Sequence, residues 1–275
     1  MTSPSDRPRP AESGHWYSRT GAARYTVIGK NGLERNTTLR DARIEGLVPS
    51  VTTIIGCADK PALRQWQKEQ IMLAALTLPR GLQEPEHSWL ARVWTDSEAT
   101  AKSASERGTA IHAAVQRYYE GERVTEWLAH AIGAKRAIDD AFPIGRWRIE
   151  ESFADPRGYG GKVDLHSSAG VGIVIDFKTK EFTEETADKL KLWDEHAMQL
   201  AGYREGLARP HAVCGICFVS STTPGLSKLV MIDDDHLARG WQMFLGLLAY
   251  WKAKNKYDST FGPADLIEPA QETQA

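Results

Sequence analysis

Cysteine is scarce in this 275-residue chain, and the scarcity excludes several kinds of protein. The three cysteines, Cys57, Cys214 and Cys217, are too few for a disulfide framework or for the four thiolates of an iron–sulfur cluster. Cys214 and Cys217 stand in AVCGICFVS, an apolar run typical of a buried strand. Because residues three apart on a strand point to opposite faces, we interpret both as core residues rather than as a metal or redox pair.

Long apolar runs and an excess of basic charge are lacking too. No stretch of about 18 apolar residues occurs, so we expect no membrane-spanning segment. The segment MTSPSDRPRP has no apolar run behind its charges, which disfavours a secretory signal and predicts a cytoplasmic protein of the producing or host cell. The formal net charge of −2 disfavours a protein that coats nucleic acid by charge alone. An enzyme with a local basic track remains compatible with that charge.

Four regions of different composition follow one another along the chain. Residues 1–14 are rich in proline, serine and charge, and we expect them to be disordered. Residues 15–104 predict a layer of short strands and helices. Residues 105–256 predict the main core, and residues 257–275 a flexible tail.

Periodicity and turn residues predict the elements of these regions. Helices are predicted at 61–78, 86–103, 105–120, 124–141, 184–208 and 234–254. Strands are predicted at 147–153, 162–167, 172–178, 212–220 and 227–232. This order favours an α/β (mixed α+β) fold class, in which a central mixed β-sheet is flanked by helices.

Charged residues interrupt two of the apolar strands. Asp176 and Lys178 lie two apart in GIVIDFK and therefore on one face of the strand, where burial is costly without a purpose. A salt-bridged pair on an edge strand is the structural alternative. Asp164 lies in KVDLHS, and the turn residues SSAGVG predict a hairpin that brings it towards Asp176. Close carboxylates repel each other, and a bound Mg²⁺ ion would relieve the repulsion.

Other polar residues are weaker candidates when each is taken alone. In WRIEESF, Glu151 shares a face with Ile149 and Phe153, so we take it rather than its neighbour as the informative acid. His112 flanks an apolar helical stripe and is more often a packed residue than a ligand. Gln199 and Tyr203, four apart on a predicted helix, lie on one face, as many solvated pairs do.

In combination, these residues resemble the PD-(D/E)xK nuclease superfamily in its RecB-like branch, in particular phage-type exonucleases and the mitochondrial single-strand exonuclease. The motifs that carry the resemblance stand in the family's order: GTAIH (108–112), Glu151, GKVD (161–164), DFK (176–178) and QLAGY (199–203). Upstream, PSVTTIIG (49–56) and LRQW (63–66) extend it with lower specificity. Val163 stands where the superfamily's name has proline, a substitution common in this branch. Too few cysteines are present for its iron–sulfur members.

The resemblance implies a restriction-endonuclease-like core and a role for each motif residue. His112, Asp164, Asp176 and the backbone carbonyl of Phe177 would bind Mg²⁺, for which Mn²⁺ can substitute, and Glu151 would hold the ion directly or through water. Lys178 would orient or deprotonate the attacking water and offset charge in the transition state. Gln199 and Tyr203 would brace Lys178 or a DNA phosphate.

Basic and aromatic residues on the upstream helices suit a single-stranded substrate. The candidates for DNA binding are Lys60, Arg64, Trp66, Lys68 and Arg107. Surface charges and packed tryptophans are the ordinary alternative. If this helical layer arched over the site, a substrate end would have to thread through it, which would favour an exonuclease.

The function expected is that of a Mg²⁺-dependent deoxyribonuclease, an exonuclease in DNA recombination, repair or phage DNA processing. Its partner would be DNA that is single-stranded or has a free end, and a single-strand annealing protein is a second partner that the resemblance implies. A structure-specific endonuclease on the same core and a catalytically inactive DNA-binding subunit are the alternatives. A further alternative is an α/β protein whose buried charges are only structural.

Overall fold

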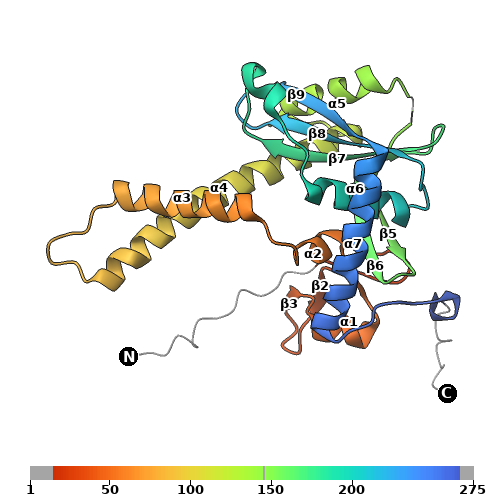
Figure 1. Cartoon of the computed structure of the whole chain (residues 1–275), viewed down its shortest axis with the longest axis horizontal. Coiled ribbons are helices and arrows are strands. Elements are labelled where there is room, and N and C mark those ends of the chain that lie inside the picture. Colours follow the sequence, from red (N-terminus) through yellow and green to blue (C-terminus); the bar gives the residue numbers. More distant parts are fainter. Residues whose placement is uncertain (1–14, 145, 267–275) are drawn as a thin grey trace.

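The computed structural model describes residues 15–144 and 146–266. The predictions for residues 1–14 and for 267–275 lie outside the described residues. Figure 1 shows a central sheet with helices on both faces, a long helical hairpin that extends away from it, and a small N-terminal unit below. Among the described residues, none of the helices combines the length and apolar composition needed to cross a bilayer.

Five strands form the main sheet, in the order β5-β6-β7-β8-β9. They are β5 (Arg148–Asp155), β6 (Tyr159–Ser167), β7 (Ile173–Lys180), β8 (Val213–Ser220) and β9 (Ser227–Ile232). β7 and β8 are parallel and the other neighbouring pairs are antiparallel. A parallel pair needs a crossover connection, and the chain from β7 to β8 supplies it with helix α6 (Asp194–Gly206). The predicted α/β fold with a mixed sheet flanked by helices is confirmed.

Two apolar cores lie on the two faces of the sheet. On one face α6 and α7 (Asp234–Asn255) pack together, with Leu200 and Phe244 in the larger core. Their close approach depends on Gly240, where a Cβ atom would lie 2.6 Å from a backbone carbon of Ala197. On the other face α4 (Glu86–Tyr119) and α5 (Leu128–Ala141) cover the sheet through residues such as Ile111. The face that carries α6 also carries most of the polar residues discussed below.

Short elements before the sheet form the N-terminal unit. They are β1 (Trp16–Tyr17), β2 (Thr26–Ile28), β3 (Glu34–Asn36), α1 (Leu39–Glu45), β4 (Val48–Pro49) and α2 (Val51–Ile55). Ser50 caps α2 by accepting a hydrogen bond from the backbone N–H of Thr53 at 2.9 Å. A bridge between Ser50 and Gly160 joins the unit to β6. The unit therefore lies against the end of the sheet that begins β6.

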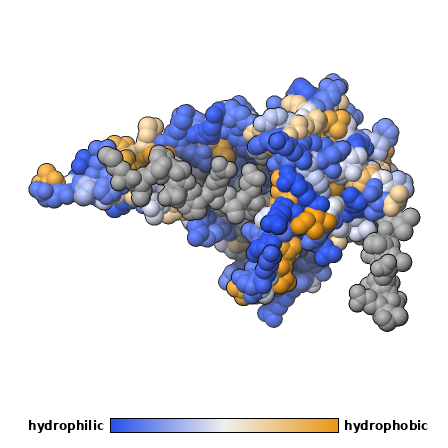
Figure 2. All heavy atoms as spheres, turned by 90° about the horizontal axis from the view of Figure 1, so that it is seen from below, coloured by the Kyte–Doolittle hydropathy of each residue, from blue (hydrophilic) through white to orange (hydrophobic). Residues whose placement is uncertain are grey.

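The long helix of the hairpin departs from the predicted elements. The helices predicted at 86–103 and 105–120 form one continuous helix, α4, because no glycine or proline interrupts the residues between them, and the predicted region boundary at 104/105 falls inside it. With α3 (Pro61–Thr77), the first part of α4 forms an arm that extends outward, while the last part of α4, around Ile111, packs on the sheet (Figures 1 and 2). The helix predicted at 184–208 was also too long: a 3₁₀ helix (Glu184–Lys189) precedes α6, which begins at Asp194.

Candidate active site

Strands β6 and β7 part at the two predicted aspartates. Their register runs Ser167↔Ile173, His166↔Val174 and Leu165↔Ile175, so the next pair in this register would be Asp164 and Asp176. There the backbone ladder ends, and the N–H of Phe177 donates instead to Asp164 Oδ2 at 2.9 Å. The carboxylate thus takes the place of a strand carbonyl, and the hairpin sets Asp164 and Asp176 side by side.

Asp176 is held at both of its carboxylate oxygens. Its exposed fraction is 1%, Lys178 Nζ lies 2.6 Å from Oδ2, and Gln199 Nε2 donates to Oδ1 at 2.7 Å. Gln199 Nε2 also donates to the Tyr203 hydroxyl at 2.9 Å. The four-residue spacing on α6 therefore serves to hold Asp176, whereas the sequence-based prediction had these two residues brace Lys178 or a phosphate.

His112 reaches the sheet from the far part of α4. Its neighbour Ile111 is fully buried against β7, which orients this turn of the helix, and His112 Nε2 lies 3.0 Å from Asp164 Oδ2. Gly108, one turn earlier, lies against Thr179 of β7, so the helix crosses the strand closely here. His112 is thus a partner of an acidic residue and not simply a packed core histidine.

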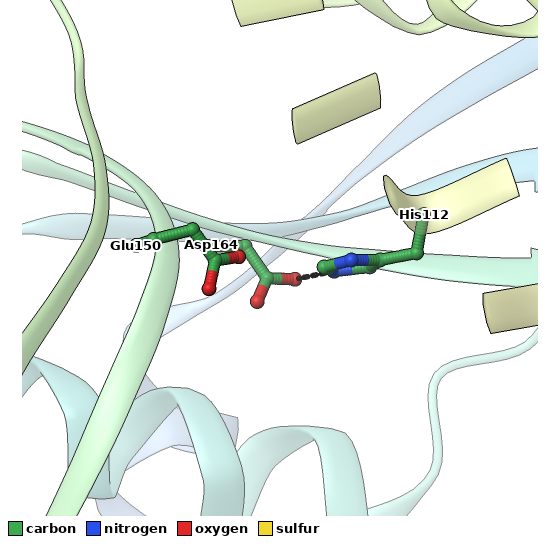
Figure 3. A group of neighbouring side chains, drawn as sticks. All are labelled: His112, Glu150 and Asp164. Carbon is green, nitrogen blue, oxygen red and sulfur yellow. Dashed lines mark ion pairs between the residues drawn. The ribbon is translucent and has the colours of Figure 1, made fainter. Parts of the chain in front are cut away.

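The acid that joins this group from β5 is Glu150, not the predicted Glu151. One ligand atom each from His112, Glu150 and Asp164 lie within 4.8 Å of one another, and Figure 3 shows the two carboxylates side by side with the imidazole approaching Asp164. Glu151 instead lies 3.0 Å from both Arg148 and His166. These contacts with β5 and with the neighbouring strand β6 hold the Glu151 carboxylate.

Strand register explains the difference between the two glutamates. The β5–β6 ladder pairs Ile149 with Leu165 and Glu151 with Val163, so Glu150 stands opposite Asp164. Glu150 also has a φ of 54°, in the left-handed region that residues with a Cβ seldom adopt. That Glu151 shares a face with Ile149 and Phe153 does not tell how β5 is aligned with β6, and this alignment decides which glutamate lies opposite Asp164.

Burial and neighbouring charges shift the protonation of the group. Burial and the Asp164 charge raise the pKa of Asp176 to about 6 although Lys178 opposes them. Burial alone would lower the pKa of His112 and of Lys178, but their carboxylate partners raise both. Burial would raise the pKa of Asp164, and His112 with Lys178 lowers it instead. Of the two aspartates, Asp176 therefore takes up a proton more readily.

The predicted DNA-binding residues lie along the arm and at its base. Lys60, at the start of α3, has its Nζ atom 2.9 Å from a carboxylate oxygen of Glu195 at the start of α6. The charge of Glu195 also helps to raise the pKa of Lys178. Arg64 is ion-paired to Asp59, and Trp66 is half-buried. Two further candidates, Lys68 and Arg107, are exposed. Of these residues Lys60 has the clearest link to the group around Asp176 and Lys178.

Comparisons with known proteins find similar solved structures but no matching protein family. No protein-family model matches the chain, and no curated protein matches it. A solved structure described as an alkaline exonuclease (LHK-Exo) from Laribacter hongkongensis is similar at 16% identity and a TM-score of 0.38, covering 78% of this chain and 92% of that one. A structure described as SSO0001 is similar at 17% identity and a TM-score of 0.24, covering 51% and 69%.

Proposed function

We propose that the chain is a divalent-metal-dependent nuclease that hydrolyses phosphodiester bonds in DNA. The observation that carries this proposal is the convergence of His112, Glu150 and Asp164 beside the Asp176–Lys178 pair. These residues come from four elements, the helix α4 and the three consecutive strands β5, β6 and β7. A cluster that was only structural would not need three carboxylates at one point, since each carries a cost of burial.

The donor set fits a hard divalent cation. Carboxylate oxygens are the ligands that Mg²⁺ prefers, and an imidazole nitrogen is also accepted by Mn²⁺. We infer that Glu150, Asp164 and Asp176 bind the ion with His112, and that the carbonyl of Phe177 joins them, as the family resemblance implies. When bound, the ion would polarise the scissile phosphate and activate a water molecule.

The chain's own residues would supply orientation and charge. The raised pKa of Lys178 keeps its ammonium protonated at neutral pH, which supports an electrostatic role at the phosphate rather than proton abstraction. About a third of its side chain is exposed, at 35%, so a phosphate can reach it. Gln199 and Tyr203 would act indirectly, by fixing the Asp176 carboxylate that Lys178 contacts.

Exonuclease action is a finer proposal and rests on the motif resemblance. The α3–α4 arm does not arch over the sheet, so the threading argument for an exonuclease loses its geometric basis. A role in recombination, repair or phage DNA processing, with a single-strand annealing protein as partner, likewise follows from the resemblance. A catalytically inactive DNA-binding subunit is disfavoured by the Asp176–Lys178 pair, which binding alone would not require.

A digestion panel tests the proposal. The purified chain is incubated with end-labelled linear and circular DNA, single- and double-stranded, with Mg²⁺ or Mn²⁺ and with EDTA. We expect cleavage only with metal, its loss in Lys178→Ala and Asp176→Asn, and no loss in the control Lys135→Ala on α5. Digestion of linear but not circular DNA supports an exonuclease, and circular cleavage an endonuclease. Metal-dependent binding without any product would establish the inactive subunit instead.

A further inference from the structure

Each carboxylate of the proposed metal group has its own cationic partner in the chain. Asp176 has Lys178, Asp164 has His112, and Glu150 has Lys162. The first two pairs belong to the motif residues already discussed. Lys162 belongs to no role assigned so far, although its ammonium group is in direct contact with the Glu150 carboxylate.

The position of Lys162 differs from that of a buried structural cation. Its side chain is 38% exposed, whereas the side chain of its partner Glu150 is only 10% exposed. Strands β1 and β4 of the N-terminal unit contact β6, which carries Lys162. The charge of Lys162 helps to lower the pKa of His15, whose ring lies 4.6 Å from that of Tyr25. Lys162 thus contacts the acidic group and lies near the His15–Tyr25 ring pair.

We propose that Lys162 is a DNA-phosphate contact that Glu150 holds until a divalent ion binds, an inference that rests on the proposed nuclease function. An ion held by Glu150 and Asp164 would neutralise the same carboxylate and repel the neighbouring ammonium group. The flexible stem of lysine lets the freed ammonium move without the backbone. A backbone phosphate placed at the ion is the nearest group of opposite charge, and stacking on Tyr25 would suit an unpaired base next to it.

This exchange couples metal binding to DNA binding. Without the ion, Lys162 is paired with Glu150 and is not free to bind a phosphate. Once the ion is bound, Lys162 becomes one additional cation for a DNA phosphate. The coupling is reciprocal, so DNA should also tighten the binding of the ion. A lysine that only neutralised Glu150 would affect the affinity for the ion and leave the phosphate contacts unchanged.

The test measures the salt dependence of DNA binding with Ca²⁺ and with EDTA. Anisotropy titrations of a labelled single-stranded oligonucleotide over a salt series give the slope of log affinity against log salt, which changes by about 0.7 for each phosphate contact on a single strand. We expect Lys162→Met to reduce the slope by about 0.7 in Ca²⁺ and to leave it unchanged in EDTA. Lys162→Arg should keep most of the slope. Lys135→Met, of similar exposure at 40%, is the control for loss of one positive charge.

A second variant releases Lys162 without any ion. In Glu150→Gln the anionic partner is removed, so we expect the slope in EDTA to increase by about 0.7, and the increase to vanish in the double variant with Lys162→Met. Calorimetry of Ca²⁺ binding adds an independent readout: Lys162→Met should bind Ca²⁺ about two- to fivefold more tightly, because a half-exposed competing cation is gone.

The outcomes separate this proposal from the proposed function. If the wild-type chain cleaves DNA with Mg²⁺ while Lys162→Met keeps the wild-type slope in Ca²⁺, Lys162 is only an internal counter-ion and this proposal is overturned alone. Weaker Ca²⁺ binding by a folded Lys162→Met also overturns it, because the lysine would then position Glu150 rather than compete for it. If the wild-type chain neither binds nor cleaves DNA, the proposed function fails first.

Discussion

Replacing Lys178 with methionine should destabilise the chain in a way that depends on pH. The substitution keeps the aliphatic stem and removes the ammonium group that lies 2.6 Å from Asp176 Oδ2. Asp176 is 1% exposed, so its charge would be left buried without its cation. Removing one partner of a buried ion pair lowers the free energy of unfolding by ~3 kcal/mol or more. The lower value applies here, because part of the Lys178 side chain reaches solvent. For a chain of this size the loss lowers the Tm by about 6–12 °C.

Protonation of Asp176 limits the loss at low pH. The pKa of Asp176 is already raised to about 6 in the native chain, so the native state binds this proton more tightly than the unfolded state and wild-type stability falls as pH rises towards 6. Without Lys178 the pKa should rise by about two further units, since one unit corresponds to about 1.4 kcal/mol. The difference between the two proteins should therefore be small at pH 5 and grow from pH 6 to about 8.

Chemical denaturation of both proteins at pH 5, 6, 7 and 8 measures this difference, in EDTA and again with Ca²⁺. A divalent ion at Asp176 would replace the missing cation, so we expect Ca²⁺ to restore most of the stability at pH 8. Lys135→Met controls for a lost surface ion pair and should change stability by less than about 1 kcal/mol at every pH. A loss in Lys178→Met that is equal at pH 5 and pH 8 would refute the assignment of the cost to a buried Asp176 charge.

Three further predictions concern the proposed metal ligands and the packing of α6. The affinity for Ca²⁺ should fall about tenfold or more from pH 7 to pH 5, because Asp176, with its pKa raised to about 6, and His112 must both lose their protons to bind the ion. A Ca²⁺ affinity that calorimetry finds unchanged between these pH values would contradict this. Glu150→Gln should weaken Ca²⁺ binding by about tenfold or more and Glu151→Gln much less, and equal effects would restore Glu151 as the ligand. Gly206→Ala would place a methyl group 1.9 Å from the ring of Phe153 on β5. This variant should lower the free energy of unfolding by about 1–3 kcal/mol in thermal denaturation. The control Gly246→Ala, which has open space around it, should not.

Local periodicity made part of the proposed active site predictable. Side chains on a strand alternate strictly, so Asp176 and Lys178 had to share a face, and their contact follows from that spacing. The four-residue spacing of Gln199 and Tyr203 on a helix likewise places them together, and they are hydrogen-bonded to each other. The hairpin between β6 and β7 was also readable from turn residues, and its register brings Asp164 next to Asp176.

Contacts between elements were decided only by the tertiary structure. Gln199 holds Asp176 rather than Lys178 because of where α6 packs on the sheet, which no local pattern specifies. The register of β5 on β6 selected Glu150 over Glu151, and a left-handed backbone at Glu150 accompanies the choice.

The arm shows the same division between sequence and structure. Its sequence predicted helices, because helix formation depends on neighbouring residues, and both α3 and α4 are helical. Its direction, away from the sheet, depends on the packing of one end of α4 against β7, where Ile111 is buried and His112 meets Asp164. The sequence by itself therefore determined the elements and the residues that share a face. The tertiary structure decided which faces meet, because distances between elements are set by packing and register over long separations in the chain.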